Sequence, residues 1–365
     1  MVASFMPRLL SMYLPQFYPI AENDEWWGKG FTEWTSVTRA RPLFPGHYQP
    51  HLPADLGFYD LRSPETRIAQ ASMARSHGID GFCYYHYWLH GRRLLDRPLR
   101  EVLESEQPDF PFCMCWANHN WNRNWSGGEQ QILLEQCYSR ADDLEHIRYL
   151  IPYFQDPRYI KVQGKPVLLV YRAEDLDDLE GTQRIWREEL AKVGIPGIYL
   201  IWIESNHLGT PHDFTQRGLD AACEFQPRTG TAGAPKPTWL RGRLRRVLPG
   251  AYGQHNVRDY ERLVRGALSR PVPAYKRYPC VTPSWDNSPR RPAPLQASIW
   301  VNSTPQAYES WLAETLLRFR PFGPDEDFVF INAWNEWAEG NHLEPDQKWG
   351  RAYLEATLRA VERAR

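Results

Sequence analysis

Eight short apolar segments, rich in β-branched and aromatic residues, recur along the 365-residue chain and constrain its fold more than any other feature. Each has the length of a buried parallel strand, and stretches of helical periodicity separate them. Eight strands alternating with helices predict a (β/α)8 TIM barrel. The competing fold is a doubly wound sheet, which would favour a glycine-rich turn after the first strand, and the chain has no such turn. The predicted strands span residues 8–14, 78–88, 110–118, 166–172, 197–205, 219–226, 278–285 and 327–335.

Two of the predicted helices have clear N-terminal signals. Ser63 and Thr304 are each followed by a proline, the arrangement of a capping residue with proline at the first helical position. Beyond Thr304 and near the end of the chain, apolar residues recur at intervals of three and four, which predicts helices with one face in the core. These stripes consist of Tyr308, Trp311, Leu312, Leu316 and Phe319, and of Tyr353, Leu354, Leu358 and Val361.

Three segments are too long for ordinary loops, namely residues 15–62, 227–256 and 286–304. Each follows a predicted strand, which in a barrel places it on the C-terminal face, where barrel proteins carry their sites. No linker divides the chain, so we predict one barrel domain over residues 1–365, with 227–256 as a loop insertion. The basic run 240–248 in that insertion suits a phosphate or a membrane surface, and equally a solvated amphipathic segment.

Composition narrows the function. With 43 Lys and Arg against 44 Asp and Glu, the chain has no strong field to attract nucleic acid or an anionic membrane. Its 16 Trp and 19 Tyr offer flat rings with polar tips that suit stacking on sugars, although many of them serve the core. No apolar run reaches the roughly 18 residues of a membrane span, and no signal peptide is recognisable. We therefore expect no integral membrane segment and a cytoplasmic protein.

The cysteines and histidines bear on metal binding. Six cysteines lie in apolar runs without the spacing of a zinc site, which predicts reduced, buried thiols. His47 with His51, and His86 with His90, have i, i+4 spacing and would bind zinc together with a carboxylate such as Asp286. A proline separates the first pair and the second begins at a strand end, so hydrogen bonding to sugar or backbone is favoured. We predict no metal and no cofactor.

The last residues of the predicted strands are rich in aromatic, amide and carboxylate side chains. Functional groups of a barrel gather at that end, and this mixture suits saccharides, whose apolar faces stack and whose hydroxyls need hydrogen bonds. We therefore predict an oligo- or polysaccharide substrate. The candidate substrate-binding residues are Trp34, Tyr85, His86, Trp88, Trp116, Asn118, Asn120, Tyr171, Glu204, Glu224, Trp285, Asn335, Trp337, His342 and Glu344.

Glu336 and Glu339 are the candidate catalytic residues, because they follow the eighth predicted strand. Glycoside cleavage needs one protonated carboxyl and one ionised carboxylate on opposite sides of the anomeric centre. Trp337 between them is an apolar neighbour that can raise the pKa of one carboxyl. Glutamates three residues apart also occur on helical turns and in solvated loops. The place at a strand end favours the catalytic interpretation.

Five long stretches of the chain are specific enough to compare with known families. They read YLPQFYPIAENDEWWGKGFTEWTSV, QPHLPADLGFYDL, GIDGFCYYHYWLHGRRLLDRPL, CWANHNWNRNW and WNEWAEGNHLEPD. Through them the chain resembles the WbsX-like family of bacterial polysaccharide-cluster proteins, often described as lipopolysaccharide biosynthesis proteins or glycosyltransferases. That family is related to glycoside hydrolase family 99.

The resemblance implies a (β/α)8 fold and retaining, endo-acting chemistry of the α-mannosidase type without a required metal. The motif Asn-Glu-Trp-x-Glu-Gly of family 99 matches residues 335–340. By this resemblance, Glu336 deprotonates the 2-hydroxyl of the sugar, which attacks the anomeric carbon to form an anhydro sugar. Glu339 then acts first as acid and afterwards as base. Ala338 stands where the hydrolases often carry a histidine, which leaves the substrate open.

Three functions remain as hypotheses. The leading one is a retaining glycoside hydrolase or transglycosidase acting on a bacterial polysaccharide. The alternative is a glycosyltransferase of O-antigen or exopolysaccharide biosynthesis, which a cytoplasmic location favours. Such an enzyme would usually need a diphosphate site, often with an Asp-x-Asp pair, and the chain offers only Asp175-Leu176-Asp177. The third is a non-catalytic carbohydrate-binding barrel, against which the retained glutamate pair argues.

Overall fold

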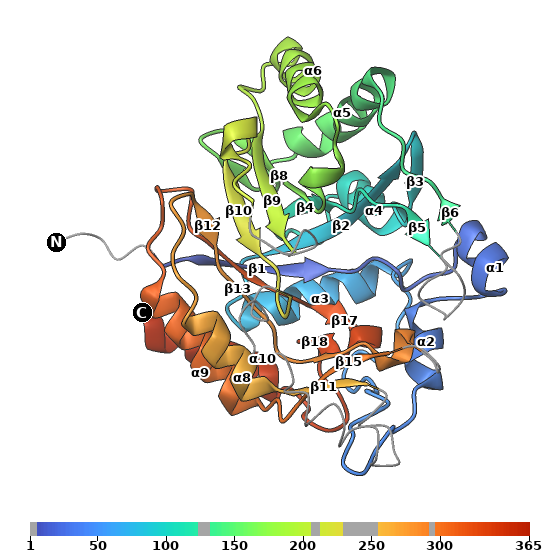
Figure 1. Ribbon diagram of the computed structural model, residues 1–365. Coiled ribbons are helices and arrows are strands. Elements are labelled where there is room, and N and C mark those ends of the chain that lie inside the picture. The colour runs from blue at the N-terminus through green and yellow to red at the C-terminus, as the bar shows by residue number, and fades with distance from the viewer. Residues whose placement is uncertain (1–5, 123–131, 206–211, 229–254, 292–295) are drawn as a thin grey trace, which may run out of the picture.

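The computed structural model describes residues 6–122, 132–205, 212–228, 255–291 and 296–365. Its centre is a sheet of parallel strands that curves round into a barrel (Figure 1). The barrel strands are β1 (Arg8–Tyr13), β2 (Gly81–Leu89), β4 (Phe112–Trp116), β8 (Lys165–Val170), β9 (Tyr199–Glu204), β10 (Ala221–Glu224), β12 (Arg277–Tyr278), β13 (Cys280–Val281) and β16 (Phe328–Ile331). They follow one another in chain order round the barrel, and β16 pairs with β1. The predicted (β/α)8 barrel is confirmed.

The seventh strand of the barrel is split into β12 and β13. β12 pairs with β10, whereas β13 pairs with β16. Pro279 lies between the two halves and has no N–H to donate to a neighbouring strand. The Pro279 carbonyl still accepts the N–H of Phe330 at 2.9 Å, so the strand stays joined to β16 through the break.

Helices cover the outside of the barrel, with α5 and α6 on one side and α8, α9 and α10 on the opposite side (Figure 1). The predicted helix starts are confirmed, because the Ser63 and Thr304 hydroxyls accept the N–H groups of Thr66 and Ala307. Between β9 and β10 the described residues form only a 3-10 turn, so the strict alternation of strand and helix fails there. The covering helices are α3 (Pro64–Ser76), α4 (Arg97–Ser105), α5 (Arg140–Gln155), α6 (Leu179–Lys192), α8 (Tyr260–Leu268), α9 (Pro305–Arg318) and α10 (Ala352–Ala364).

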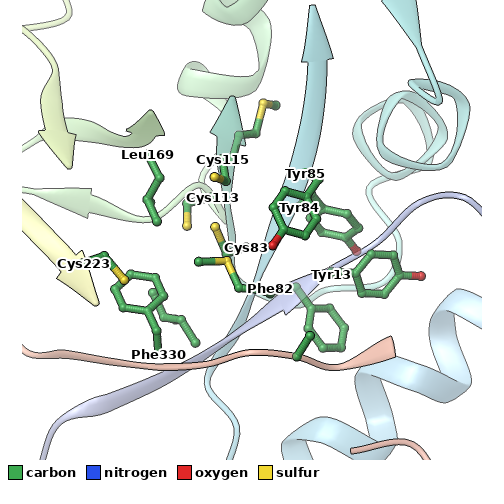
Figure 2. Close-up of a cluster of buried hydrophobic side chains, with 14 of the residues drawn as sticks. Tyr13, Phe82, Cys83, Tyr84, Tyr85, Cys113, Cys115, Leu169, Cys223 and Phe330 are labelled. Atoms are coloured by element: carbon green, nitrogen blue, oxygen red, sulfur yellow. The ribbon is translucent and has the colours of Figure 1, made fainter. Parts of the chain in front are cut away.

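The barrel interior is fixed by alternation along each strand. Strand register places Met12 beside Cys83, and Cys83 beside Cys113, so these side chains share one face of the sheet. Figure 2 shows the thiols of Cys83, Cys113 and Cys223 grouped with Leu169 and Phe330, apart from the rings of Tyr13, Phe82 and Tyr84. Tyr13 donates to Gln70 of α3, so this second group faces the helices. All six cysteines are free thiols; five are buried as predicted, but Cys137 is exposed.

The long segments contain more regular structure than the sequence suggested. The first carries α1 (Ala21–Trp27) and α2 (Glu33–Arg39). The third, expected to be a loop, contributes β15 (Ser298–Val301), which pairs with β14 (Trp285–Asp286) and β11 (Asn256–Asp259). The expectation missed β15 because its three apolar residues form a run of only four with Ser298, which is at the lower limit of length for a strand signal.

Other parts of the chain complete the description. Most of the predicted insertion 227–256, including the basic run 240–248, lies outside the described residues. Among the helices that are described, none combines the length and the apolar character needed to cross a membrane. Short strands pair as local hairpins: β3 (Arg92–Leu94) with β2, β7 (Lys161–Val162) with β8, and β5 (Trp121–Asn122) with β6 (Ile132–Leu134).

Candidate active site

A pocket of about 140 Å³ lies at the C-terminal mouth of the barrel. Its floor continues the interior face of the strands. Tyr85 comes two residues after Cys83, Ala117 two after Cys115, and Phe225 two after Cys223, and all three line the pocket. Because side chains two apart on a strand share a face, the pocket stands directly above the packed interior. This is the end of a (β/α)8 barrel where active sites are built.

The two candidate catalytic glutamates enter this pocket on a tight hairpin after β16. Strand β17 (Asn335–Glu336) pairs with β18 (Asn341–His342), and a 3-10 turn from Trp337 to Glu339 connects them. The Asn335 side chain fastens the hairpin, since it accepts the N–H of Leu14 at 2.7 Å and donates to the carbonyl of Leu14 at 3.0 Å. Both glutamates line the pocket.

Gly340 is required for this hairpin to close. Its φ is +55°, a left-handed conformation that side chains disfavour. A Cβ atom at this position would lie 3.0 Å from the Cβ of Asp286 and 3.2 Å from its backbone nitrogen. The turn that carries Glu339 therefore depends on a residue without a side chain.

One guanidinium joins three carboxylates at the pocket wall. Arg290 contacts Glu336 at 2.7 Å and Glu339 at 2.9 Å, and it also binds Glu33 of α2. Glu33 accepts the N–H of Ala338 at 3.0 Å, so it supports the turn as well as the arginine. We call Glu33, Arg290, Glu336 and Glu339 the pocket cluster. If all its members were ionised, it would carry two uncompensated negative charges.

This imbalance, together with burial, sets the acidity of Glu336. Burial raises the pKa of Glu336 to about 8, and the neighbouring Glu339 and Glu33 add to the rise, although Arg290 opposes it. Burial also raises the pKa of Glu33. Glu336 is almost fully buried, whereas the Glu339 side chain is 20% exposed. The two glutamates of the motif therefore differ in environment, as an acid and base pair requires.

Aromatic and basic side chains form the rest of the wall. Tyr85, Tyr171 and Trp285, which the sequence predicted, line the pocket. An adjoining polar pocket of about 260 Å³ shares His119 with it. Asn118 and Asn120 line this second pocket, so they lie beside the pocket that contains Glu336 and Glu339 and not in it. Residues that also line the first pocket are Leu14, Tyr87, His119, Arg228, Asn287 and Arg291.

Three predicted residues face the helices and not the pocket. His86 and Trp88 alternate with Tyr85 and Tyr87, so they point to the opposite side of the sheet. His86 lies 2.9 Å from His146 of α5, and the Trp88 indole donates to Asp142. The Trp116 indole, on the same outer side, donates to the carbonyl of Trp88 at 3.0 Å. Because these side chains already have partners on α5 and neighbouring strands, they serve to attach the helix layer.

Glu204 and Glu224 also leave the interior face. Glu224 pairs with Glu204 in register, one step out of phase with Phe225 of the pocket. Arg270 binds Glu204 at 2.6 Å and Glu224 at 3.0 Å, and Arg277 lies 3.3 Å from Glu224. We call Glu204, Glu224, Arg270 and Arg277 the wall cluster. Its two positive and two negative charges balance.

The remaining predicted residues lie behind the glutamate turn. Trp34 packs against Trp337 with ring centroids 5.3 Å apart, and its indole donates to the carbonyl of Tyr59. The Trp337 indole donates to Glu344 at 2.6 Å, and its ring stacks on His342 at 3.7 Å. Burial raises the pKa of Glu344 to about 7. These side chains support the turn from the side opposite the pocket.

The histidine pairs considered from sequence are separated by the fold. His47 accepts the N–H of Leu43 through Nδ1, so its Nε2 donates to Asp286 at 2.6 Å and both ring nitrogens are occupied. His51 lies instead 2.9 Å from His342. His86 pairs with His146 and not with His90. Neither i, i+4 pair therefore presents two free nitrogens to one metal ion.

Sequence reasoning missed Glu33 and Arg290 as members of the site. Arg290 lies 257 residues from Glu33 in sequence, and neither belongs to a barrel strand. One signal was available for each: Glu33 stands in the quoted stretch GFTEWTSV, and Arg290 stands in the third long segment, which was expected on the C-terminal face. Neither signal specifies which residue of the segment reaches the glutamates.

The barrel carries a glutamate pair at its C-terminal mouth, where (β/α)8 barrels build their active sites. Its fold is similar to that of a solved endo-alpha-mannosidase of glycoside hydrolase family 99 from Bacteroides thetaiotaomicron, with a TM-score of 0.58, 15% identity and coverage of 98% of this chain and 97% of that one. A solved structure named "Glycoside hydrolase-like protein" is equally similar, with a TM-score of 0.58, 12% identity and coverage of 99% and 95%.

The chain belongs to the family described as "Glycosyltransferase WbsX", whose model matches residues 9–357. It is also 43% identical, over 357 residues and 98% of its length, to "Uncharacterized protein WxcX" of two Xanthomonas campestris strains. The chain spans about half the length of these relatives, since the match covers 50% of each. The family description and the structural relatives both point to carbohydrate-active enzymes.

Proposed function

We propose that the chain is a retaining, endo-acting glycoside hydrolase or transglycosidase of bacterial polysaccharide, with Glu336 and Glu339 as its catalytic residues. The observation that carries the proposal is the shared Arg290, which holds both carboxylates at one wall of a pocket lined by tyrosine and tryptophan rings. Flat rings suit the apolar faces of sugars, and a pair of carboxylates in unlike environments suits glycosidic bond cleavage.

In the first step, Glu336 takes the proton of the substrate 2-hydroxyl, and that oxygen attacks the anomeric carbon. The glycosidic bond breaks as Glu339 gives its proton to the leaving oxygen, which produces a 1,2-anhydro sugar. In the second step, Glu339 takes a proton from water or from an acceptor hydroxyl, whose oxygen opens the anhydro ring at the anomeric carbon. Glu336 returns its proton to the 2-oxygen. Two inversions give net retention.

The environments of the two glutamates support this assignment. A sugar hydroxyl is a very weak acid, so a base with a high pKa is better matched to it than an ordinary carboxylate. The raised pKa of Glu336 meets this need once the carboxyl is ionised. Glu339 is the more exposed of the two, which suits a group that must exchange protons with the leaving group and with incoming water.

The roles are tested by substitution with glutamine and by varying the leaving group. We expect Glu336→Gln and Glu339→Gln to lower kcat/KM by at least about 1,000-fold on an unactivated polysaccharide. An activated aryl glycoside needs no protonation of its leaving group, so it should restore the first step in Glu339→Gln but not in Glu336→Gln. Glu326→Gln is the control, because Glu326 is a buried carboxylate bound to Lys276, away from the pocket. Full activity of Glu339→Gln on the unactivated substrate would refute the assignment.

A glycosyltransferase is the second candidate, favoured by the family description and by the basic side chains of the pocket. Arg228, Arg290 and Arg291 all line it, and guanidinium groups suit the diphosphate of an activated sugar donor. The two functions are separated by incubating the chain with polysaccharides and with sugar nucleotides. New reducing ends without released nucleotide support hydrolysis, whereas nucleotide released only with an acceptor sugar supports transfer. The non-catalytic alternative requires that neither product forms.

A further inference from the structure

A third pocket, of about 310 Å³, lies behind the glutamate turn, and its lining includes three side chains that commonly bind metal ions. We propose that His51, His342 and Asp346 form a binding site for a divalent transition-metal ion, with zinc as the best match to two imidazoles and one carboxylate. Among the residues that the structure describes, these three form a group whose ligand atoms all lie within 4.8 Å of one another. All three side chains are buried.

The distances within the group suit a shared ion. His51 Nδ1 lies 2.9 Å from His342 Nε2, and His342 Nε2 lies 3.8 Å from Asp346 Oδ2. Zinc ligands lie about 2.0 to 2.2 Å from the metal, so atoms bound to the same ion lie roughly 3 to 3.5 Å from each other. Small side-chain rotations would bring the three atoms to these separations.

Outer hydrogen bonds already orient two of the ligands. His342 Nδ1 lies 2.9 Å from the carbonyl of Glu344, and since a carbonyl only accepts, Nδ1 carries the proton. The lone pair of Nε2 is thereby turned toward His51. Asp346 Oδ1 accepts the N–H groups of Lys348 and Trp349, which leaves Oδ2 to face the histidines. Metal-binding histidines characteristically donate their second nitrogen to a carbonyl or carboxylate in this way.

The backbone brings the two parts of the site together without an ion. Pro53 and Asp346 form an isolated β-bridge, and the N–H of Gln347 donates to the carbonyl of Leu52 at 2.9 Å. His51 is 291 residues away from His342 in sequence, so this pairing is a product of the fold. A preformed group needs little rearrangement to bind its ion, which favours affinity.

The site adjoins the proposed catalytic turn through one aromatic contact. The His342 ring stacks on Trp337 with centroids 3.7 Å apart and an interplanar angle of 12°, and Trp337 lies between Glu336 and Glu339. A bound ion would therefore fix the segment around His51 to the hairpin that carries the glutamates. Three protein ligands leave one position of a tetrahedral ion for a water molecule. This positioning role does not require the glycosidase assignment to hold.

Zinc binding by the full chain tests the proposal. The purified protein is stripped with a chelator, dialysed and titrated with zinc chloride by calorimetry. We expect one equivalent of zinc to bind. Loss of a residue that only hydrogen-bonds to a ligand weakens metal affinity by about 10- to 100-fold, and we expect His51→Gln and Asp346→Asn, which remove ligands, to weaken it by more. His146→Gln should bind zinc like the wild type, because His146 belongs to another buried histidine pair. No stoichiometric binding, or unchanged binding in both ligand variants, would overturn the site.

A spectroscopic measurement keeps the test independent of variant folding. X-ray absorption at the zinc edge of the loaded wild-type chain should show two imidazole nitrogens and carboxylate or water oxygens. Sulfur in the first coordination shell would instead assign the ion to a cysteine such as the exposed Cys137, and would overturn the proposal. Near-UV circular dichroism of each variant establishes that its fold is retained before its affinity is compared.

Discussion

The pocket cluster and the wall cluster both combine buried glutamates with arginines from later in the chain, yet they differ in charge balance. The pocket cluster has three carboxylates for one guanidinium, whereas the wall cluster has two for two. Burial raises the pKa of Glu224 even though two arginines lie beside it. In the pocket cluster, burial raises the pKa of Glu336 to about 8. The balanced cluster is suited to hold strands together, and the unbalanced one to move a proton.

Removing the single arginine of the pocket cluster should have the largest effect. Arg290→Met leaves three carboxylates without the guanidinium they share, so the pKa of Glu336 rises further and the fraction of Glu336 that is ionised at neutral pH, already small, falls further. We expect kcat/KM to fall by about 1,000-fold or more, equivalent to roughly 4 kcal/mol. Steady-state kinetics on folded protein measure it. A variant that kept a tenth of wild-type activity would show that Arg290 is dispensable.

The matched change in the wall cluster should affect stability and not turnover. Arg270→Met leaves Glu204 and Glu224 buried with one arginine, Arg277, in place of two. Breaking a buried ion pair costs about 3 to 5 kcal/mol, so the free energy of unfolding in urea should fall by that amount. The kcat/KM of the folded fraction should change less than about twofold. A large loss of activity at unchanged stability would instead place the wall cluster in substrate binding.

The pocket cluster should make stability depend on pH. Folded Glu336 keeps its proton up to about pH 8, whereas an unfolded glutamate loses it near pH 4.5, so the folded state binds one more proton in this window. Stability therefore falls as pH rises from about 5 to 8. Glu336→Gln removes this contribution, so we expect its free energy of unfolding, relative to that of the wild type, to rise by roughly 3 to 4 kcal/mol between about pH 5 and 8. Parallel stability curves would contradict the raised pKa.

A smaller effect is expected when the third carboxylate loses its charge. Glu33→Gln keeps an oxygen to accept from Arg290 and Ala338 but removes a negative charge that raises the pKa of Glu336. The rising limb of kcat/KM against pH, which reports ionisation of Glu336 as base, should move toward lower pH. Rates measured between about pH 5 and 10 test this. A limb that stays in place or moves upward would separate Glu33 from the chemistry.

Much of the fold could be predicted from the sequence, because the barrel is built from local patterns. Ser63 and Thr304 begin helices by the caps that their sequence indicates, and all eight predicted strands overlap observed ones. Strand ends were less certain. The seventh predicted strand runs through Trp285, whereas the structure ends the barrel part at Val281 and gives Trp285 to another sheet. Trp285 leaves the barrel because it pairs with β15, and a pattern within the strand itself does not reveal a partner that lies elsewhere in the sequence.

The site could be predicted only in part, because residue type does not reveal which face a strand presents. In β2 all nine residues are buried, so hydrophobicity shows no alternation, and Tyr85 could not be told from His86. A shift of one residue exchanges the pocket side for the helix side. The prediction that Glu336 and Glu339 are catalytic remains a prediction. The absence of a metal also remains a prediction, and the proposed site at His51, His342 and Asp346 opposes it.

Hydrogen exchange should reveal a seam in the barrel at the split seventh strand. β12 meets β10 over two residue pairs, whereas β2 meets β4 over five. Beyond that short ladder, the Cys280 N–H reaches the Glu224 side chain at 3.4 Å in place of a backbone carbonyl. Amide protons on this border will exchange ahead of those on β2 and β4. When the barrel opens under denaturant, it will part first between its sixth and seventh strands, beside the mouth of the pocket.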